Sequence, residues 1–224
     1  MELKDKVVVI TGGTKGLGKA MALSFLENNS KVIVCSCEEN KPKDLNEEIF
    51  WIKADVTKEG ELKDLAEKVV EKFGKLNIWI NNAGVWMVRD FVENLDMKKV
   101  REMFDVNVFG LMNGTQIAIR YMKKVGSGTI INIISDAALI KQPRLSSSAY
   151  MASKYAVNGF TSAVRGENKN ISIFSIYPGA TKTDLFRENK PENFDSFMDP
   201  NDVANKIIEN LKKDIPLEEL IIKR

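Results

Sequence analysis

Residues 7–18 read VVVITGGTKGLG, and residues 19–29 continue as KAMALSFLENN. The first five residues are apolar or β-branched without interruption, which is typical of a parallel strand covered on both faces. Spaced glycines follow directly, and after them comes a segment with apolar residues at helical spacing. The sequence therefore predicts a strand, a glycine-rich turn and a helix, which is the local context in which such a turn binds a dinucleotide.

Three glycines of this turn each have a physical task in such a site. Gly12 permits a tight turn, Gly16 lets a pyrophosphate approach the backbone, and Gly18 lets the helix pack closely on the strand. The first helical turn offers N–H groups and partial positive charge to the phosphates. The alternative is a glycine-rich connection that binds no ligand. In that case folding would lose the conformational entropy of three glycines without a compensating gain in binding.

Apolar runs of strand type recur along the whole chain, separated by segments of helical period. The runs lie at residues 6–11, 31–36, 49–53, 77–80, 129–134, 171–176 and 219–222. Residues 37–48 are too polar and too short for a crossover helix, so we expect an irregular link there. This alternation predicts an α/β fold over residues 1–224: a single doubly wound Rossmann-type domain with about seven parallel strands and helices on both faces.

Two of the helical segments carry clear end signals. For the helix over 58–73, Thr57 is the expected N-cap and Gly74 the stop. For the helix over 200–213, Asp199 is the expected cap and Pro200 the first helical residue.

The composition excludes several classes of protein. The formal charge is only +2, which argues against a nucleic-acid or membrane partner. Histidine is absent, so triads and metal sites that use imidazole are excluded. Cys35 and Cys37 are the only cysteines, too few for a disulfide framework or a complete metal site. No apolar run is long enough to span a bilayer and no signal peptide precedes the first strand, so we expect a cytoplasmic protein without a metal.

With the glycine-rich turn, five further motifs resemble the short-chain dehydrogenase/reductase family over almost the whole chain. They are Asn81-Asn82-Ala83-Gly84 after the fourth strand, Asn107 in a helix, Ser135 after the fifth strand, and Tyr150-x-x-x-Lys154; Pro178-Gly179 then follows the sixth strand. The resemblance implies hydride transfer between a nicotinamide cofactor and a carbonyl/alcohol pair.

The tyrosine and lysine would carry the proton transfer. Tyr150 and Lys154 are four residues apart and so share one helix face. A phenol ordinarily has a pKa of about 10, and a neighbouring ammonium group lowers it. Alone, such a pair is usually a surface pair, but the resemblance makes Tyr150 the proton donor in carbonyl reduction, and Lys154 the residue that binds the nicotinamide ribose.

Two polar residues complete the expected catalytic set. The resemblance makes Ser135 the hydroxyl that polarises the substrate oxygen, although Ile134 replaces the more usual serine before it. Asn107 falls on an apolar helix stripe, where a buried amide needs partners. It is either a structural bond between helices or, by resemblance, the asparagine that holds a water linked to Lys154.

Further residues are expected to contact the cofactor by resemblance. Asp55 would meet the adenine, with a plain strand-end cap as its alternative, and Thr183 would lie against the nicotinamide carboxamide. The full set of expected cofactor contacts is Gly12, Thr14, Lys15, Gly16, Leu17, Gly18, Ser36, Asp55, Val56, Asn82, Ala83, Gly84, Tyr150, Lys154, Pro178, Gly179 and Thr183.

The second strand bears on the choice of cofactor. An NAD-selecting site places a carboxylate at the end of this strand, and here Ser36 occupies that position, with Glu38 and Glu39 nearby. Lys15 stands before Gly16, where the resemblance places a basic residue against a 2′-phosphate; the alternative is a solvated loop lysine. We therefore predict that NADP(H) is preferred moderately and that NAD(H) is possible.

The expected function is a carbonyl or 3-oxoacyl reductase acting on a small-molecule carbonyl/alcohol substrate. The alternative is a catalytically silent sensor or scaffold that binds the cofactor. Aromatic and apolar residues suggest an apolar substrate; the candidate pocket residues are Trp86, Met87, Arg89, residues 142–145, Leu185, Phe186, Phe194 and Phe197.

Small residues also form a stripe on the helix that contains Tyr150. Ala152, Ala156, Gly159 and Ala163 lie opposite the stripe of Tyr150, Lys154, Val157 and Thr161. The resemblance predicts that this helix pairs with its symmetry mate in a homodimer or homotetramer; the alternative is close packing within the protomer.

Overall fold

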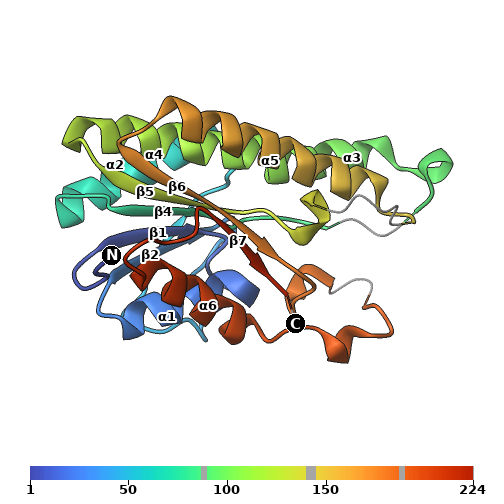
Figure 1. Cartoon of the computed structure of the whole chain (residues 1–224), viewed down its shortest axis with the longest axis horizontal. Helices are drawn as coiled ribbons and strands as arrows, with labels where there is room; N and C mark the ends of the chain where they lie inside the picture. The colour runs from blue at the N-terminus through green and yellow to red at the C-terminus, as the bar shows by residue number, and fades with distance from the viewer. Residues whose placement is uncertain (87–89, 140–144, 187–189, 224) are drawn as a thin grey trace.

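The computed structural model describes residues 1–86, 90–139, 145–186 and 190–223. A seven-stranded sheet runs through the middle of the molecule with strand order β3-β2-β1-β4-β5-β6-β7, and every neighbouring pair is parallel (Figure 1). Its strands are β1 (Val7–Thr11), β2 (Lys31–Ser36), β3 (Phe50–Lys53), β4 (Ile78–Asn81), β5 (Gly128–Ile133), β6 (Ile171–Pro178) and β7 (Glu219–Ile222). The predicted fold class is confirmed.

Helices cover both faces of this sheet. On one face lie α1 (Gly16–Glu27) and α6 (Pro200–Lys212); on the other lie α2 (Glu59–Phe73), α4 (Leu111–Val125) and α5 (Ser148–Glu167), with α3 (Met97–Phe104) beyond them (Figure 1). The short helices are η1 (Val92–Asn94), η2 (Asp105–Gly110), η3 (Asp136–Ala138), η4 (Asp184–Phe186) and η5 (Phe194–Ser196). Between β2 and β3 the chain forms only turns and bends, as expected for residues 37–48.

The central strands are almost continuously apolar because each one contributes side chains to two cores. Val8 and Ile10 pack towards α1 and α6, whereas Val7 and Val9 pack towards α2 and α4. All four are at most 1% exposed. A strand buried on both faces shows no alternation of apolar and polar residues, which explains the pattern of the sequence.

A chain of polar side chains crosses the second core beneath the strand ends. Asn81 accepts from Trp79 Nε1 at 2.7 Å and donates to Thr115 and Asn132, and Asn132 donates to Thr161 on α5. The four polar residues of this chain, excluding Trp79, are at most 3% exposed. Because every buried group has a partner, the chain fixes α4 and α5 against the sheet without an unsatisfied donor.

The helix-end predictions hold for α6 and fail at one end of α2. Asp199 accepts from the Asn201 N–H, Pro200 opens α6, and Gly74 ends α2 with a positive φ of 73°. Thr57 does not cap α2, because Lys58 occupies the N-cap position without a side-chain bond. The Thr57 hydroxyl instead donates to Asp55 Oδ1 at 2.8 Å.

The strand order places a switch point between β1 and β4. From β1 the chain proceeds outwards to β2 and β3, and it then returns to β4 on the other side of β1. In open parallel sheets, ligands bind in the crevice outside the carboxyl ends of the strands at such a point. The glycine-rich turn, Asn82 and Ser135 all follow carboxyl ends of central strands.

Candidate active site

A cavity of about 550 Å³ opens at this switch point. Every residue predicted to contact the cofactor lines it, and so do Ser135, Tyr150 and Lys154. Asn107 does not line the cavity; it lies behind it and is 2% exposed. The fold thus brings together residues that are up to 171 positions apart in the sequence, from Gly12 to Thr183.

The glycine-rich turn is shaped by close backbone contacts. Gly12 and Gly16 have positive φ values of 62° and 52°, a region that favours glycine. A Cβ on Gly12 would lie 2.9 Å from Ala83 Cα, and one on Gly18 would collide with the Gly12 carbonyl. A Cβ on Gly16 would lie 3.1 Å from Thr183 Cβ, so the turn and the segment after β6 lie side by side.

Asn82 clamps this turn from the neighbouring strand. Its side-chain amide donates to the carbonyl oxygens of Thr11 and Gly12, both at 3.0 Å. Its backbone N–H and that of Ala83 donate to Thr11 Oγ1 at 3.0 and 3.1 Å. The sequence suggested that these residues lie along a cofactor, and the structure adds that Asn82 holds the turn in shape.

The start of α1 faces the same cavity. Its N-cap, Lys15, makes no side-chain capping bond, and the first turn contains no acidic residue. The N–H groups of this turn therefore keep their capacity to bind an anion, and the partial positive charge of the helix end is not neutralised.

Tyr150 and Lys154 project from α5 into the cavity. Both are buried, at 9% and 7% exposed, and Lys154 Nζ lies 5.6 Å from the centroid of the Tyr150 ring. Burial lowers the pKa of Lys154 from 10.5 to about 8. An ammonium group held in this position favours the ionised phenol, which is the property that proton transfer by a tyrosine needs.

Ser135 caps the short helix η3 at the end of β5. Its Oγ accepts from the Ala137 N–H at 3.1 Å and donates to Asp136 Oδ1 at 3.4 Å. The bond to Asp136 is long and therefore weak, so the hydroxyl can turn its proton towards another acceptor in the cavity.

Asn107 lies in η2, a π-helical turn between α3 and α4. Its Oδ1 accepts from the Val85 N–H at 2.8 Å, and its Nδ2 donates to the Val85 carbonyl at 2.9 Å. The amide thus fixes the extended segment after β4. Its Nδ2 also donates to Ser153 Oγ on α5 at 3.5 Å, so the bond between helices that was the alternative is present as a long contact. The predicted water link to Lys154 stays a prediction.

At the end of the cavity predicted to bind the adenosine, the sequence predicted the position of Ser36 but not its hydrogen-bond partners. Ser36 lines the cavity as predicted, but its Oγ donates to Glu38 Oε2 at 2.8 Å and accepts from Trp51 Nε1 at 3.0 Å. The Glu38 carboxylate also lies 3.9 Å from Lys15 Nζ. The carboxylate of Glu38, which the sequence placed near the cofactor-selecting position, therefore stands directly beside Ser36.

Asp55 acts as the strand-end cap that was one of the two alternatives, and its contact with the adenine stays a prediction. It lines the cavity next to Val56, and its Oδ1 also accepts from the Thr57 N–H at 2.9 Å, which closes the turn after β3.

A family model described as short chain dehydrogenase matches residues 6–193. The chain belongs to this family.

Its relatives include a 3alpha-hydroxysteroid dehydrogenase of Mediterraneibacter gnavus, 34% identical, with 83% of this chain and 77% of the relative covered. Similar structures include a 3-ketoacyl-(acyl-carrier-protein) reductase from Brucella melitensis in complex with NADH, 26% identical, with a TM-score of 0.88 and 98% and 97% of the two chains covered. Another is ElxO with NADP bound, 29% identical, with a TM-score of 0.86 and 97% of each chain covered. The protein is therefore a nicotinamide-dependent oxidoreductase of the class that acts on CH–OH and C=O groups.

The substrate side of this dehydrogenase is aromatic. Trp86, Leu185, Phe186 and Phe197 line the cavity, and Phe194 packs behind Phe186 and Phe197. Leu145, also expected here, is 74% exposed and does not line it. Met87, Arg89 and residues 142–144 lie outside the described residues. Asp136 and Asp184 line the cavity too, and only their position after a strand end could have suggested them.

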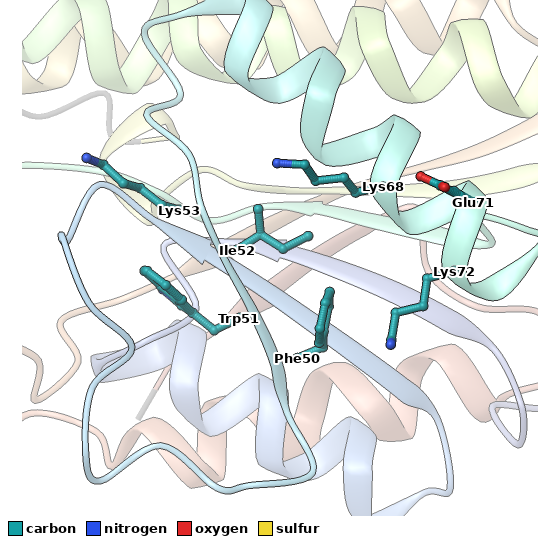
Figure 2. Close-up of a pocket in the computed structure, with 7 residues that line it drawn as sticks. All are labelled: Phe50, Trp51, Ile52, Lys53, Lys68, Glu71 and Lys72. Atoms are coloured by element: carbon teal, nitrogen blue, oxygen red, sulfur yellow. The ribbon is translucent and has the colours of Figure 1, made fainter.

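A second hollow of the dehydrogenase, an open groove of about 600 Å³, lies at the sheet edge between β3 and α2 (Figure 2). Its polar lining consists of Lys53, Lys68, Lys72 and Glu71, beside Phe50, Trp51 and Ile52. Lys53 is paired with Glu39 at 2.7 Å, and Lys72 lies over the Phe50 ring at 4.8 Å. The groove is lined by neither the glycine-rich turn nor Tyr150, so we place no chemistry there.

Two features are absent from the described ranges. No helix there is long and apolar enough to span a bilayer. No cluster of three or more acidic or cysteine side chains there could hold a metal ion. Cys35 and Cys37 are both free thiols, and burial raises the pKa of Cys35 to about 12.

Proposed function

We propose that this dehydrogenase catalyses hydride transfer between NADP(H) and a carbonyl/alcohol substrate, with Tyr150, Lys154, Ser135 and Asn107 as its catalytic set. The observation that carries the proposal is the buried Lys154 ammonium beside the Tyr150 ring, in a cavity that the glycine-rich turn also lines. Removing a charged amine from water carries a considerable free-energy penalty. The burial of Lys154 is therefore most readily explained by a functional role of its amine at that site.

The chain's residues fit a dinucleotide. Side chains at Gly12 or Gly18 would fill the space against Ala83 and the Gly12 carbonyl, and the uncapped start of α1 supplies N–H groups for the pyrophosphate. When bound, the nicotinamide supplies or accepts the hydride. Thr183, beside Gly16, and the Pro178-Gly179 segment are proposed to hold the carboxamide end.

Within this set, Tyr150 donates the proton to the substrate oxygen in reduction and removes it in oxidation. Lys154 favours the phenolate through its charge, and its burial removes the competing solvation by bulk water. Ser135 turns its hydroxyl from Asp136 to the substrate oxygen and so holds that oxygen near the phenol. Asn107 acts from behind by fixing Val85, and the water that it is proposed to hold would connect to Lys154.

The preference for NADP(H) rests on Lys15, whose ammonium group lies at the adenosine end of the cavity. Glu38 acts in the opposite sense, because its carboxylate pairs with Lys15 and can accept a bond from a ribose hydroxyl. We therefore propose a moderate preference for NADP(H), with NAD(H) also accepted. The bound cofactors of the two similar structures, NADP and NADH, support either choice.

For the substrate we propose a carbonyl or 3-oxoacyl compound. The activities for which two similar proteins are named, on a hydroxysteroid and on a 3-ketoacyl group, support this class. The silent sensor is the weaker alternative, because all four catalytic residue types are present and three of them line one cavity.

We propose further that the protein is a cytoplasmic two-fold oligomer that pairs through α5, without nucleic-acid or membrane partners. Ala152, Gly159 and Ala163 of the small-residue stripe are exposed in the protomer, whereas Tyr150, Lys154, Val157 and Thr161 are buried. Most of the stripe therefore does not pack within the protomer and is available to a symmetry mate.

The test is a panel of carbonyl compounds supplied with NADPH or NADH, in which loss of the reduced nicotinamide is followed by absorbance. We expect reduction of at least one ketone or 3-oxoacyl compound, faster with NADPH. Tight binding of the cofactor without turnover of any panel member or of the matching alcohols would favour the sensor instead.

A further inference from the structure

An unbroken row of aromatic rings leads away from the proposed proton donor. The Trp86 ring lies 4.4 Å from the Tyr150 ring, centroid to centroid, and 5.6 Å from the Phe186 ring. Phe186 in turn lies 5.3 Å from Phe197 and 6.2 Å from Phe194. We call Trp86, Phe186, Phe194 and Phe197 the aromatic wall.

Two separate segments of the chain build this wall. Trp86 follows β4, whereas the three phenylalanines lie between β6 and α6. Trp86, Phe186 and Phe197 face the cavity; Phe194 supports them, with Lys190 Nζ 4.7 Å from the centroid of its ring. Such distances are those of direct ring-to-ring packing.

The position of Trp86 is set by the residue before it. Asn107 holds both the N–H and the carbonyl of Val85, at 2.8 and 2.9 Å. The indole is thereby anchored against the Tyr150 ring rather than carried by a freely moving loop. A substrate whose carbonyl group reaches the Tyr150 hydroxyl can therefore place a neighbouring substituent against Trp86.

The charged residues that line the cavity bear on the charge that this substituent can carry. Among the described residues that line it, the only cations are Lys15 and Lys154, and both belong to the proposed cofactor contacts. On the substrate side the described lining residues include the carboxylate of Asp184, which would repel a carboxylate or a phosphate.

We infer that the substrate is a ketone, or the matching secondary alcohol, that carries an uncharged apolar ring next to the reacting carbon, and that Trp86 is the residue that selects it. The inference rests on the proposed function and narrows its substrate class. A ring packed on the indole is removed from water and gains the offset contact of paired aromatic rings. An open-chain ketone of similar reactivity covers less of the wall.

The test uses two activated diketones, 1-phenyl-1,2-propanedione, which carries a ring, and 2,3-pentanedione, which does not. Steady-state kcat/KM is measured for both with NADPH in the wild type, Trp86→Phe, Trp86→Ala and the control Phe91→Ala, since Phe91 is 55% exposed and does not line the cavity. We expect the wild type to favour the ring-bearing diketone by about tenfold. Trp86→Ala should abolish that ratio through KM, whereas Trp86→Phe and Phe91→Ala should keep most of it.

A binding measurement decides the inference without turnover. Calorimetric titration of each diketone into the protein with NADP⁺, where no hydride can be donated, should show tighter binding of the ring-bearing compound in the wild type, Trp86→Phe and Phe91→Ala, but not in Trp86→Ala. Equal binding of the two diketones, or a preference that survives Trp86→Ala, would overturn the inference even if both are reduced. Failure of the proposed function has a different signature, in which neither diketone nor any panel carbonyl consumes NADPH.

Discussion

Lys154 is the residue in which stability and function are most directly opposed. Depression of its pKa from 10.5 to about 8 corresponds to roughly 3 kcal/mol of unfavourable free energy for the charged amine in the fold. Replacement by the uncharged Lys154→Met, of similar length, should therefore raise the stability of the cofactor-free protein by about 1–3 kcal/mol at pH 7. By calorimetry this is an increase in Tm of roughly 3–8 °C, and turnover should be lost.

The pH dependence of that difference has a definite sign. Because the folded-state pKa is lowered, the unfolded chain binds more protons between pH 8 and pH 10.5, so the contribution of Lys154 to stability rises with pH over this window. The advantage of Lys154→Met should shrink as the pH is raised from 8 to 10.5. The control Lys206→Met, at an exposed position of α6, should change Tm little. An unchanged or lowered Tm for Lys154→Met would contradict the account.

The pair of Lys15 and Glu38 makes opposite predictions for the two cofactors. Lys15→Ala removes the charge that meets a 2′-phosphate and should weaken NADPH binding by about tenfold while affecting NADH little. Glu38→Gln removes the competing carboxylate, so it should strengthen NADPH binding a few-fold and weaken NADH binding. Fluorescence titration of both reduced cofactors measures these changes, and raised salt should reduce them. Equal losses for both cofactors in Lys15→Ala, or a wild-type preference for NADH, would overturn the preference.

At the scale of elements, the sequence predicted the strands well because their apolar runs are short and nearly continuous, and the central strands β1, β4, β5 and β6 are buried on both faces. The run expected at 6–11 is β1 (Val7–Thr11), and the run at 171–176 begins where β6 begins. The expected cap Thr57 failed because two short polar side chains compete at one turn, and Asp55 engages the threonine hydroxyl. Local sequence gives no measure of that competition.

The site was predictable in its residues and less so in its contacts. Motif spacing identified the residues that line the cavity, but the π-helical turn at Asn107 gave no signal, since the helical pattern continues through it. The turn of the chain after β2 brings the Glu38 carboxylate to the Ser36 hydroxyl, which donates a hydrogen bond to it. Trp51, from β3, donates a second hydrogen bond to the same hydroxyl. Such contacts depend on tertiary placement and not on local pattern.

Packing of α4 on the sheet depends on Gly114. A Cβ at this position would collide with Asn81 Oδ1 and lie 2.8 Å from Trp79 Nε1. Gly114→Ala should therefore break the Trp79–Asn81 bond and lower the free energy of unfolding by about 2–4 kcal/mol. The control Gly166→Ala in α5, where nothing lies within 4 Å, should be neutral or stabilising by up to about 1 kcal/mol. Urea titration compares the two, and equal midpoints would contradict this role for Gly114.

At the scale of the whole molecule, the exposed stripe on α5 leads to a prediction about assembly. Light scattering at micromolar concentration should give a mass of two or four chains. Gly159→Arg should shift it towards one chain, because this position has nothing within 4 Å in the protomer and the arginine can be accommodated there without refolding. A wild-type protein that is monomeric at this concentration, or an unchanged mass for Gly159→Arg, would refute pairing through α5.

The central claim is that Tyr150, activated by Lys154, transfers the proton in carbonyl reduction. Its most direct test is the rate of NADPH oxidation with a reducible ketone in Tyr150→Phe, measured together with NADPH affinity. The ring that packs against Trp86 is kept and only the hydroxyl is lost, so the fold and cofactor binding should persist while kcat falls by about 10²–10⁴. Turnover close to that of the wild type, with NADPH still bound, would contradict the account.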